Sequence, residues 1–534
     1  MRTIKYVALA GMAALVVSCS DFLEEYSQSS FYAESWEDLN ELLVGSGYVQ
    51  PEVCGTMSQT GSPNFGTFIH YVGDELDENN LAVESRTISY SKPYTFGYYT
   101  WQQRSGQNQE YTDFYDDNKE WTKCYYGINV ANNILAAVGS VPCATDEEIR
   151  GCAKVRAEAR FLRAAFYYWL VNVYGQPYNA ATADTDLGVP VKTSENVEDR
   201  KFDRNTVQEV YDLILSDLEA ARADFRIYDT EKNSIYRADS TAVNLLLSRV
   251  FLYMGRWQEC VDAANRVIDA HPALMQLNGN NSPFSVEGNV ENIFSMGGND
   301  LPAQMDYAYQ GYRVSAELYG LYGDDDLRKT QWFWHLGHFI GLTKLEPYNV
   351  STNESLSPSA PDYYYYELYV HGWGGKIASV SNVFLLRSAE AYLNKAEAEA
   401  YLGHETEARE ALNHLRGYRY QTGTAEVTAS GEELVGEIRK ERRKEFILEG
   451  QRWFDLRRYR VCPVYPERIS LTHDYTYYVD ELSTEIVRRE RFVLEEDDPS
   501  WTLPIPYEVL EFNTGMQGNG NPFREGTIID NPTN

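Results

Sequence analysis

Positive charge is scarce in this 534-residue chain. Its 47 Lys and Arg residues face 79 Asp and Glu residues, so the net charge is −32 at neutral pH. The phosphates of a nucleic acid would be repelled by such a chain, and we exclude nucleic acid as a partner. Long apolar runs are also missing after residue 18. A membrane-spanning helix needs about 20 such residues, so the main body is not expected to cross a membrane.

Cysteine is sparse as well. Seven cysteines in a chain of this length are far fewer than a disulfide-stapled scaffold contains, and none shows the paired CxxC spacing of a zinc site. Cys143 and Cys152 flank a predicted helix start and could form a disulfide, although spacing alone does not establish the geometry. The cysteines after the leader are Cys54, Cys124, Cys143, Cys152, Cys260 and Cys462.

Known catalytic and cofactor signatures are absent. The sequence contains no HExxH, GxSxG, phosphate-loop or dinucleotide-binding motif. His335 and His338 form the one close histidine pair, without an evident third metal ligand, and Asp324–Asp326 lacks the alternating ligands of a calcium loop and is interpreted as a solvated acidic turn. We expect a non-enzyme without metal or cofactor. A glycosidase remains an alternative, because its two carboxylates are defined by their separation in space.

The N-terminus carries the strongest export signal. Arg2 and Lys5 precede the apolar run Tyr6–Val17, a pattern typical of a secretory signal peptide over residues 1–18. The sequence Val16-Val17-Ser18-Cys19 resembles the lipobox of bacterial lipoproteins, which predicts that the thiol of Cys19 is acylated, with palmitate as the expected acyl group, and becomes the mature N-terminus. The alternative is an ordinary secretory signal that contains a cysteine.

Three capping boxes predict helix starts. A Ser or Thr three residues before an acidic residue can satisfy the free N–H groups at a helix start, and the pattern occurs at Ser35–Asp38, Thr145–Glu148 and Thr206–Glu209. Apolar residues at helical spacing follow the last two boxes, over Val155–Val173 and Val207–Phe225. We expect long amphipathic helices there, and another from about residue 118.

A further helix is predicted after Ser430, and its second half is strongly charged. The run Arg439-Lys440-Glu441-Arg442-Arg443-Lys444-Glu445 interleaves basic residues with glutamates. Residues three positions apart are neighbours on a helix surface. We therefore expect a solvated face of ion pairs rather than a nucleic-acid-binding patch.

Two segments of the chain resemble each other. When Gly255 is aligned with Gly403, Val250–Val267 and Ala398–Leu415 share a tyrosine before the glycine and alanines after it. Both look like tetratricopeptide helix pairs, which predicts a right-handed stack of helix hairpins. Cys260 falls opposite a small alanine, so we expect a buried free thiol.

Several motifs together resemble one family. The segments Glu441–Phe446 and Glu449–Arg458 closely resemble the C-terminal signature of SusD/RagB lipoproteins. Leu503–Pro506, Arg160–Ala164 and the start Cys19–Leu23 resemble other elements of that family. The resemblance extends from the signal peptide to about residue 522. One departure is the order of residues in the Gly/Asn-rich segment 517–523, where the family usually has Asn-Pro-Gly-aromatic.

The resemblance implies a mainly α fold, in which tetratricopeptide-like helix hairpins form one side and long irregular loops form the ligand-facing side. It implies a single body over residues 19–534, with an N-terminal half of about 19–225 and a C-terminal half of about 226–534. The implied function is capture of a nutrient, most often a glycan, at the outer face of a Gram-negative outer membrane. The implied partner is a TonB-dependent transporter of the SusC type. Capture of peptides by the same architecture is the alternative.

Two irregular regions rich in aromatic residues, 51–115 and 270–375, are the expected ligand-facing loops. The apolar C–H faces of a sugar can lie on Trp or Tyr rings while neighbouring polar groups bind its hydroxyls. Tyr98, Tyr99 and Trp101 lie next to Gln102, Gln103 and Arg104, and tryptophans of the second region could complete the platform. The predicted ligand-binding residues are Tyr98, Trp101, Gln103, Arg104, Tyr309, Trp332 and Trp334.

Overall fold

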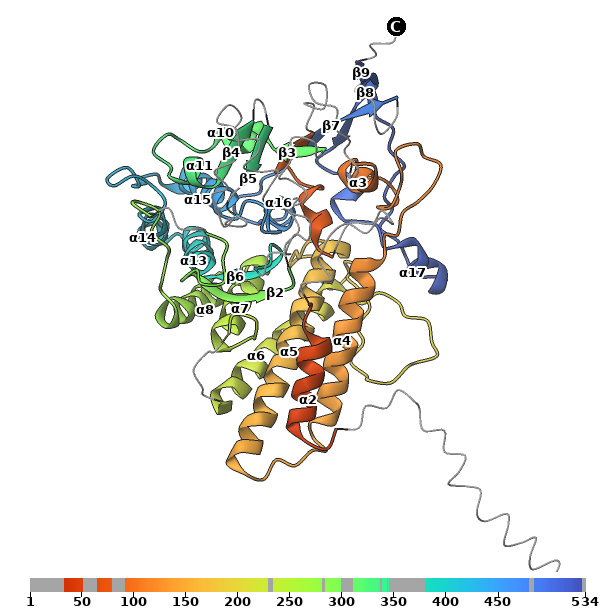
Figure 1. Ribbon diagram of the computed structural model, residues 1–534, viewed down its shortest axis with the longest axis vertical. Coiled ribbons are helices and arrows are strands. Elements are labelled where there is room, and N and C mark those ends of the chain that lie inside the picture. The colour runs from red at the N-terminus through yellow and green to blue at the C-terminus, as the bar shows by residue number, and fades with distance from the viewer. Residues whose placement is uncertain are drawn as a thin grey trace, which may run out of the picture.

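A long helix, α5 (Asp146–Tyr174), is the central element of the N-terminal part of the computed structural model (Figure 1). It packs between α4 (Lys119–Ala137) and α6 (Val207–Tyr228), and the short α2 (Trp36–Leu42) lies against it. The structure describes residues 33–50, 65–78, 92–228, 234–280, 284–298, 311–336, 339–342, 344, 380–479 and 485–530. The proposed signal peptide and Cys19 lie outside these ranges.

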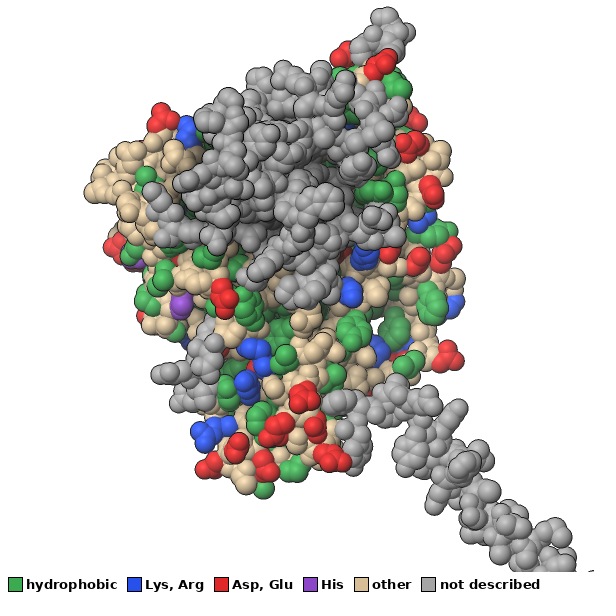
Figure 2. All heavy atoms as spheres, in the orientation of Figure 1, with side chains coloured by type: hydrophobic (Ala, Val, Ile, Leu, Met, Phe, Trp, Pro, Cys, Tyr) green, Lys and Arg blue, Asp and Glu red, His purple; other side chains and the backbone are tan. Residues whose placement is uncertain are grey.

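The three predicted capping boxes are confirmed. The Ser35 hydroxyl accepts from the N–H of Asp38, whose carboxylate accepts from the N–H of Ser35. Thr145 with Glu148 makes the same reciprocal bonds at the start of α5, and Thr206 with Glu209 makes them before α6. Each box satisfies N–H groups that the first helical turn leaves free. In Figure 2, acidic side chains gather at this lower end of the helical region, where α4 meets the acidic first turn of α5.

The described cysteines include one disulfide-bonded pair. Cys143 and Cys152 form a disulfide that joins the loop before α5 to its second turn. Cys260 is fully buried, with its thiol directed to the carbonyl oxygen of Asn394, as predicted from its position opposite a small alanine. Cys124 is also free and buried.

The two similar segments form two helix hairpins. The first is α7 (Ser240–Tyr253) with α8 (Trp257–Ala270), and the second is α13 (Ser388–Leu402) with α14 (Glu405–Arg416). Helices α8 and α13 pack against each other, so the hairpins stack as expected (Figure 1). Gly255 and Gly403 turn the chain with φ values of 73° and 83°, a conformation that side chains disfavour.

The strands form small antiparallel sheets of two or three strands beside and between the helices. β1 (Leu76–Glu78) pairs antiparallel with β3 (Tyr312–Val314), so segments from both predicted irregular regions meet there. The other antiparallel pairs are β2 (Asn292–Met296) with β6 (Phe384–Arg387), β4 (Phe333–Leu336) with β5 (Phe339–Leu342), β7 (Leu471–Tyr478) with β8 (Ile486–Leu494), and β8 with β9 (Thr527–Asp530).

The expectation of little regular structure over residues 51–115 is partly wrong, because α3 (Lys92–Tyr99) is a helix of eight residues. Its sequence is rich in aromatic residues and has no helical apolar period, so its helix depends on burial by the rest of the fold. The remaining short helices are α10 (Ala316–Gly320), α11 (Arg328–Gln331), α16 (Arg452–Arg460) and α17 (Tyr507–Phe512). In the part of the chain that the structure describes, no helix is long and apolar enough to span a membrane.

The second half of α15 (Gly431–Glu445) contradicts the solvated face predicted from its charges. Glu441, Arg442, Lys444 and Glu445 are buried, with Arg442 and Glu445 at 0% exposure. The prediction of ion pairing is right, but the prediction of solvent exposure is wrong. Cations and anions from distant segments meet this face of the helix, and single-sequence patterning cannot show that.

Three of these charges, Glu441, Lys444 and Glu445, belong to one buried ion network, whereas Arg442 pairs with Asp455. The Glu445 carboxylate forms ion pairs with Arg387 at 2.6 Å and with Arg419 and Arg328 at 2.8 Å each. The network connects six cations with five carboxylates from seven segments of the chain, which ties the second irregular region to the hairpin stack. Its members are Arg328, Lys344, Arg387, Arg416, Arg419, Lys444, Glu291, Asp326, Glu441, Glu445 and Glu449.

The predicted acidic turn Asp324–Asp326 has one exposed end and one end buried in this network. The Asp324 carboxylate is exposed and pairs with Lys329 at 2.8 Å, as a solvated turn should. Asp326 is buried and forms a bidentate contact with Arg328, so the prediction is wrong for that residue. No cluster of metal-ligating residues is found among the described residues.

Candidate ligand-binding site

Two predicted platform residues of the first region are buried. Trp101 is 1% exposed, its indole stacks on the His473 ring at 4.3 Å, and its Nε1 donates to the Val72 carbonyl at 2.9 Å. Tyr98 is also buried and packs against Phe68 at 5.0 Å. Neither ring offers a face to solvent in this structure, so the expectation of an exposed platform at these two residues is wrong. Tyr98 and Trp101, whose aromatic rings suggested a recognition surface, instead pack in the core.

Trp332 in the second region is buried too. Its ring lies 4.2 Å from the Lys344 ammonium and 4.7 Å from the Phe284 ring, so it covers the buried ion network. Trp334 lies in β4, but its side chain is outside the described part of the structure, as is all of Tyr309. The structure therefore does not join Trp101 and Trp332 in one platform.

Arg104 does reach the surface, between two aromatic rings. Its guanidinium carbon lies 3.6 Å from the centre of the Phe114 ring and 4.1 Å from the centre of the Tyr507 ring. The rings are 43% and 42% exposed, and the neighbouring Gln103 is exposed as well. We call Arg104, Phe114 and Tyr507 the arginine sandwich. Figure 2 shows hydrophobic side chains reaching the surface on the side of the molecule where α17 lies.

Close backbone approach shapes the loop that carries Arg104 and Phe114. A Cβ on Gly97 would meet the Ser105 carbonyl oxygen at 2.3 Å, and one on Gly106 would meet the Tyr115 carbonyl oxygen at 2.0 Å. Only glycine permits these contacts. The Tyr115 N–H donates to the Gly106 carbonyl at 2.7 Å, which folds the loop back on itself and brings Phe114 beside Arg104.

The third member of the sandwich comes from the other end of the chain. Tyr507 opens α17, directly after the extended segment Leu503–Pro506. Leu503 and Ile505 are buried, and the Leu503 N–H donates to the Val173 carbonyl at the end of α5. The Asn118 side chain also hydrogen-bonds Glu508 on α17. The apolar residues of the extended segment therefore anchor Tyr507 over the loop.

Arg104 and Gln103 are candidates predicted from the sequence, whereas the two rings that contact Arg104 are not. Phe114 lies in a region already marked as aromatic, and Tyr507 follows a segment already marked as extended. The signal that could have found Tyr507 is its position directly after two prolines, where a short exposed element begins. The contact of Tyr507 with Arg104 joins residues 403 positions apart, which no local pattern reveals.

The arginine sandwich holds hydrogen-bond donors in a fixed position. Cation–π contacts of Arg104 with two rings, each about 0.5–1 kcal/mol at exposed sites, keep its planar donors in place. Burial raises the pKa of the nearby Asp117 to about 6, although the charge of Arg104 opposes that rise. A preorganised fork of N–H donors between apolar ring edges can bind hydroxyl groups of a sugar lying against the rings.

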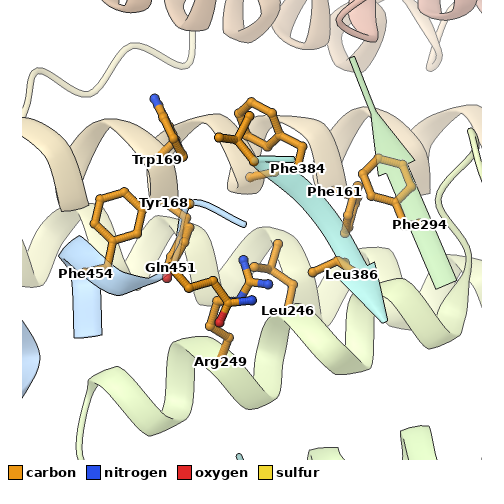
Figure 3. Close-up of a pocket in the computed structure, with 13 residues that line it drawn as sticks. Phe161, Tyr168, Trp169, Leu246, Arg249, Phe294, Phe384, Leu386, Gln451 and Phe454 are labelled. Atoms are coloured by element: carbon orange, nitrogen blue, oxygen red, sulfur yellow. The ribbon is translucent and has the colours of Figure 1, made fainter. Parts of the chain in front are cut away.

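A second feature, an internal cavity, does not qualify as a ligand site. It lies between α5, α7, the β2–β6 pair and α16, and is lined by Phe161, Trp169, Arg249, Phe384 and Gln451 among others (Figure 3). Its volume is about 30 Å³. That is room for about one water molecule, whereas small-molecule pockets measure about 300–1,000 Å³.

Comparison with known families agrees with this architecture. The family model described as "SusD family" matches residues 279–523, and a second model, described as "Starch-binding associating with outer membrane", matches residues 65–252. The chain belongs to the SusD family. The buried charges of α15 and the Leu503–Pro506 anchor both lie in the first of these matches, so they are features of a SusD chain.

Known SusD-like proteins are similar over most of their length. The chain is 28% identical to SusD-like protein P2 of Formosa agariphila over 408 residues, which covers 67% of this chain and 75% of that protein. It is 21% identical to a SusD-like protein of Bacteroides ovatus over 462 residues, covering 77% of this chain and 79% of that one.

Solved structures confirm the fold. A SusD superfamily protein of Bacteroides vulgatus aligns with a TM-score of 0.66 and 20% identity, covering 92% of this chain and 100% of that chain. A SusD-like carbohydrate binding protein of the same organism aligns with a TM-score of 0.64 and 17% identity, covering 91% and 98%. The mainly α, SusD-like fold expected from the motifs is therefore correct.

Proposed function

We propose that this SusD-family chain is a cell-surface carbohydrate-binding lipoprotein, and that the arginine sandwich with Gln103 forms part of its ligand site. The observation that carries this proposal is the partly exposed Arg104, whose guanidinium is held between two half-exposed rings. Aromatic edges and a fixed fork of donors match the two kinds of surface on a sugar. The description of one matching family model as starch-binding and associating with the outer membrane supports the same class of ligand.

The proposal extends to location and partner. Acylated Cys19 would hold the protein in the outer membrane, facing the cell exterior, and a SusC-type TonB-dependent transporter would receive the captured oligosaccharide. More than one acyl chain is needed for a stable anchor, since each buried CH₂ contributes about 0.8 kcal/mol. The protein would bind its ligand without cleaving it.

Isothermal titration against a polysaccharide panel tests the site. We expect Arg104→Ala, Phe114→Ala and Tyr507→Ala each to weaken binding about tenfold, which corresponds to about 1.4 kcal/mol. Phe512→Ala is the matched control, because Phe512 lies on α17, is 83% exposed and is not part of the sandwich. Unchanged binding in all three sandwich variants would refute the site assignment.

Two further measurements separate the alternatives. A peptide mixture offered to the wild type should yield no enriched ligand, and enrichment of peptides without any glycan binding would replace carbohydrate by peptide as the ligand. Product analysis after incubation with a bound polysaccharide should show intact ligand, whereas released sugars would identify a glycosidase. Radiolabelled palmitate should label the wild type and leave Cys19→Ala unlabelled.

A further inference from the structure

We propose a second carbohydrate site in a pocket on the helix-hairpin side, built from elements that the arginine sandwich does not use. The pocket has a volume of about 270 Å³ and is lined by the α7–α8 turn, the end of α13, residues 178–181 and the segment after α16. This volume is close to the lower limit of small-molecule sites, which fits one sugar ring. In Figure 1, α17 and the hairpins lie on different sides of α5.

Aromatic rings form one wall of this hairpin pocket. The Trp257 and Tyr401 rings lie 5.2 Å apart and meet at 52°, and Tyr178 and Tyr253 line the same space. Two rings at such an angle form a corner that can contact the C–H face and the edge of one sugar ring. Trp257 is only partly buried, so its ring is accessible from outside.

The charge of the hairpin pocket is balanced before any ligand enters. Arg458 lines it, but its guanidinium is bound by Glu397 at 2.5 and 2.8 Å and by Asp455 at 2.8 Å. The Tyr401 hydroxyl also donates to Glu397, at 2.6 Å. An anionic ligand would find no free cation here, and a cationic ligand would find the carboxylates already occupied. The pocket therefore favours a neutral ligand.

Polar groups remain for a ligand with hydroxyls. The Tyr253 side chain lines the pocket, and its hydroxyl is buried beside Tyr168. Asn179, which is partly exposed, lines the same space and offers an amide that can donate to and accept from a ligand. Gly255 adds open backbone at the turn, because a Cβ there would meet nothing within 4 Å. A neutral sugar ring satisfies both the aromatic wall and these polar groups.

Cys462 lines the hairpin pocket and provides a reporter for the test. It is free and partly exposed, whereas the other described free thiols, Cys124 and Cys260, are buried. We would measure the rate at which N-ethylmaleimide modifies Cys462 in the full chain, by peptide mass spectrometry. The probes are glucose, galactose, mannose and N-acetylglucosamine, each added separately at increasing concentration, with Cys462→Ser identifying the reporter peptide.

We expect at least one sugar to slow modification about tenfold at saturation. Trp257→Ala should abolish the protection, Trp257→Phe should retain part of it, and the exposed neighbour Gln258→Ala should leave it unchanged. Protection should persist in Arg104→Ala, so this proposal and the sandwich site can fail independently. Absence of protection by all four sugars, or protection that persists in Trp257→Ala, would overturn the assignment.

Discussion

The surroundings of α5 and of α15 bury charge in opposite ways. Near α5, Arg163 pairs with Asp217 at 2.7 Å, and Glu158 pairs with Arg237 at 2.6 Å, so these two ion pairs stand apart from each other within an apolar helical bundle. On α15, by contrast, the carboxylates are shared among several cations from distant segments. Near α5 the ion pairs add to a core that apolar packing already forms. On α15 the ion pairs themselves join the segments of the chain.

The pKa values follow this difference. Glu120 on α4 accepts from the Gly66 N–H at 2.5 Å and from Trp169 Nε1 at 3.3 Å, but it pairs with no cation among the described residues. Burial therefore raises its pKa to about 8. Burial would also raise the pKa of Glu441, yet Arg328 and other cations around it hold that pKa well below its usual value. Equal burial thus shifts the pKa of a carboxyl group in opposite directions, depending on whether cations lie beside it.

The largest expected effect comes from breaking the network at its centre. Glu445→Gln should lower the free energy of unfolding by about 3–5 kcal/mol, because Arg328, Arg387 and Arg419 would each lose a carboxylate partner while they stay buried, which leaves positive charge in the network uncompensated. Urea unfolding followed by circular dichroism measures this change.

The matched control lies on the same helix. Glu437→Gln removes a carboxylate whose pair with Lys440 is partly exposed, and it should cost less than about 1 kcal/mol. Similar losses of unfolding free energy in both variants would show that the buried network stabilises the fold no more than a partly exposed ion pair does.

The disulfide at the start of α5 tests the other side of the comparison. Cys143→Ser with Cys152→Ser opens a bridge between residues nine positions apart, and the chain-entropy estimate for such a short loop is about 2–3 kcal/mol. The thermal midpoint of the double variant should fall to that of the reduced wild type. A midpoint equal to that of the oxidised wild type would mean that α5 is held by packing alone.

The pH dependence should have opposite signs in the two regions. Because its folded pKa is raised from 4.5 to about 8, Glu120 contributes stability at low pH that is lost as the pH rises through this interval. The lowered pKa of Glu441 contributes stability above about pH 4.5 that is lost as the pH falls.

Urea midpoints of the wild type and Glu120→Gln between pH 4.5 and 8 isolate the first effect. The free energy of unfolding of the wild type should decline by at most about 1.4 kcal/mol per pH unit over this interval, and the variant should lack this decline. Parallel curves for the two proteins would contradict the raised pKa.

The smallest expected effect compares the two helix starts. Thr145→Ala should cost about 1 kcal/mol, because the Thr145 side chain caps α5. Ser430→Ala should cost only a few tenths, because Ser430 precedes α15 without a side-chain capping bond. Thermal midpoints of both variants provide the measurement, and equal shifts would show that the capping hydrogen bond adds nothing.

Much of the scaffold was predictable because its signals are local. The capping boxes, the apolar period of α5 and the repeated hairpin around Gly255 and Gly403 each lie within about twenty residues, the range over which helical patterns act. The predicted site fared differently. Arg104 reached the surface between two rings, while Trp101 and Trp332 became packing residues. An aromatic residue in an irregular segment has the same local signature whether it packs or binds.

The sequence by itself determined the long helices, the three capping boxes, the hairpin repeat and, through its motifs, the family. Tertiary structure alone decided which charges are buried and which rings are exposed. Glu441 sits in a pattern that a solvated helix would also show, and only the arrival of Arg328 makes its burial tolerable. The physical reason is that desolvation and its compensation depend on distance in space. Residues such as Arg104 and Tyr507, far apart along the chain, come into contact only where the fold brings them together.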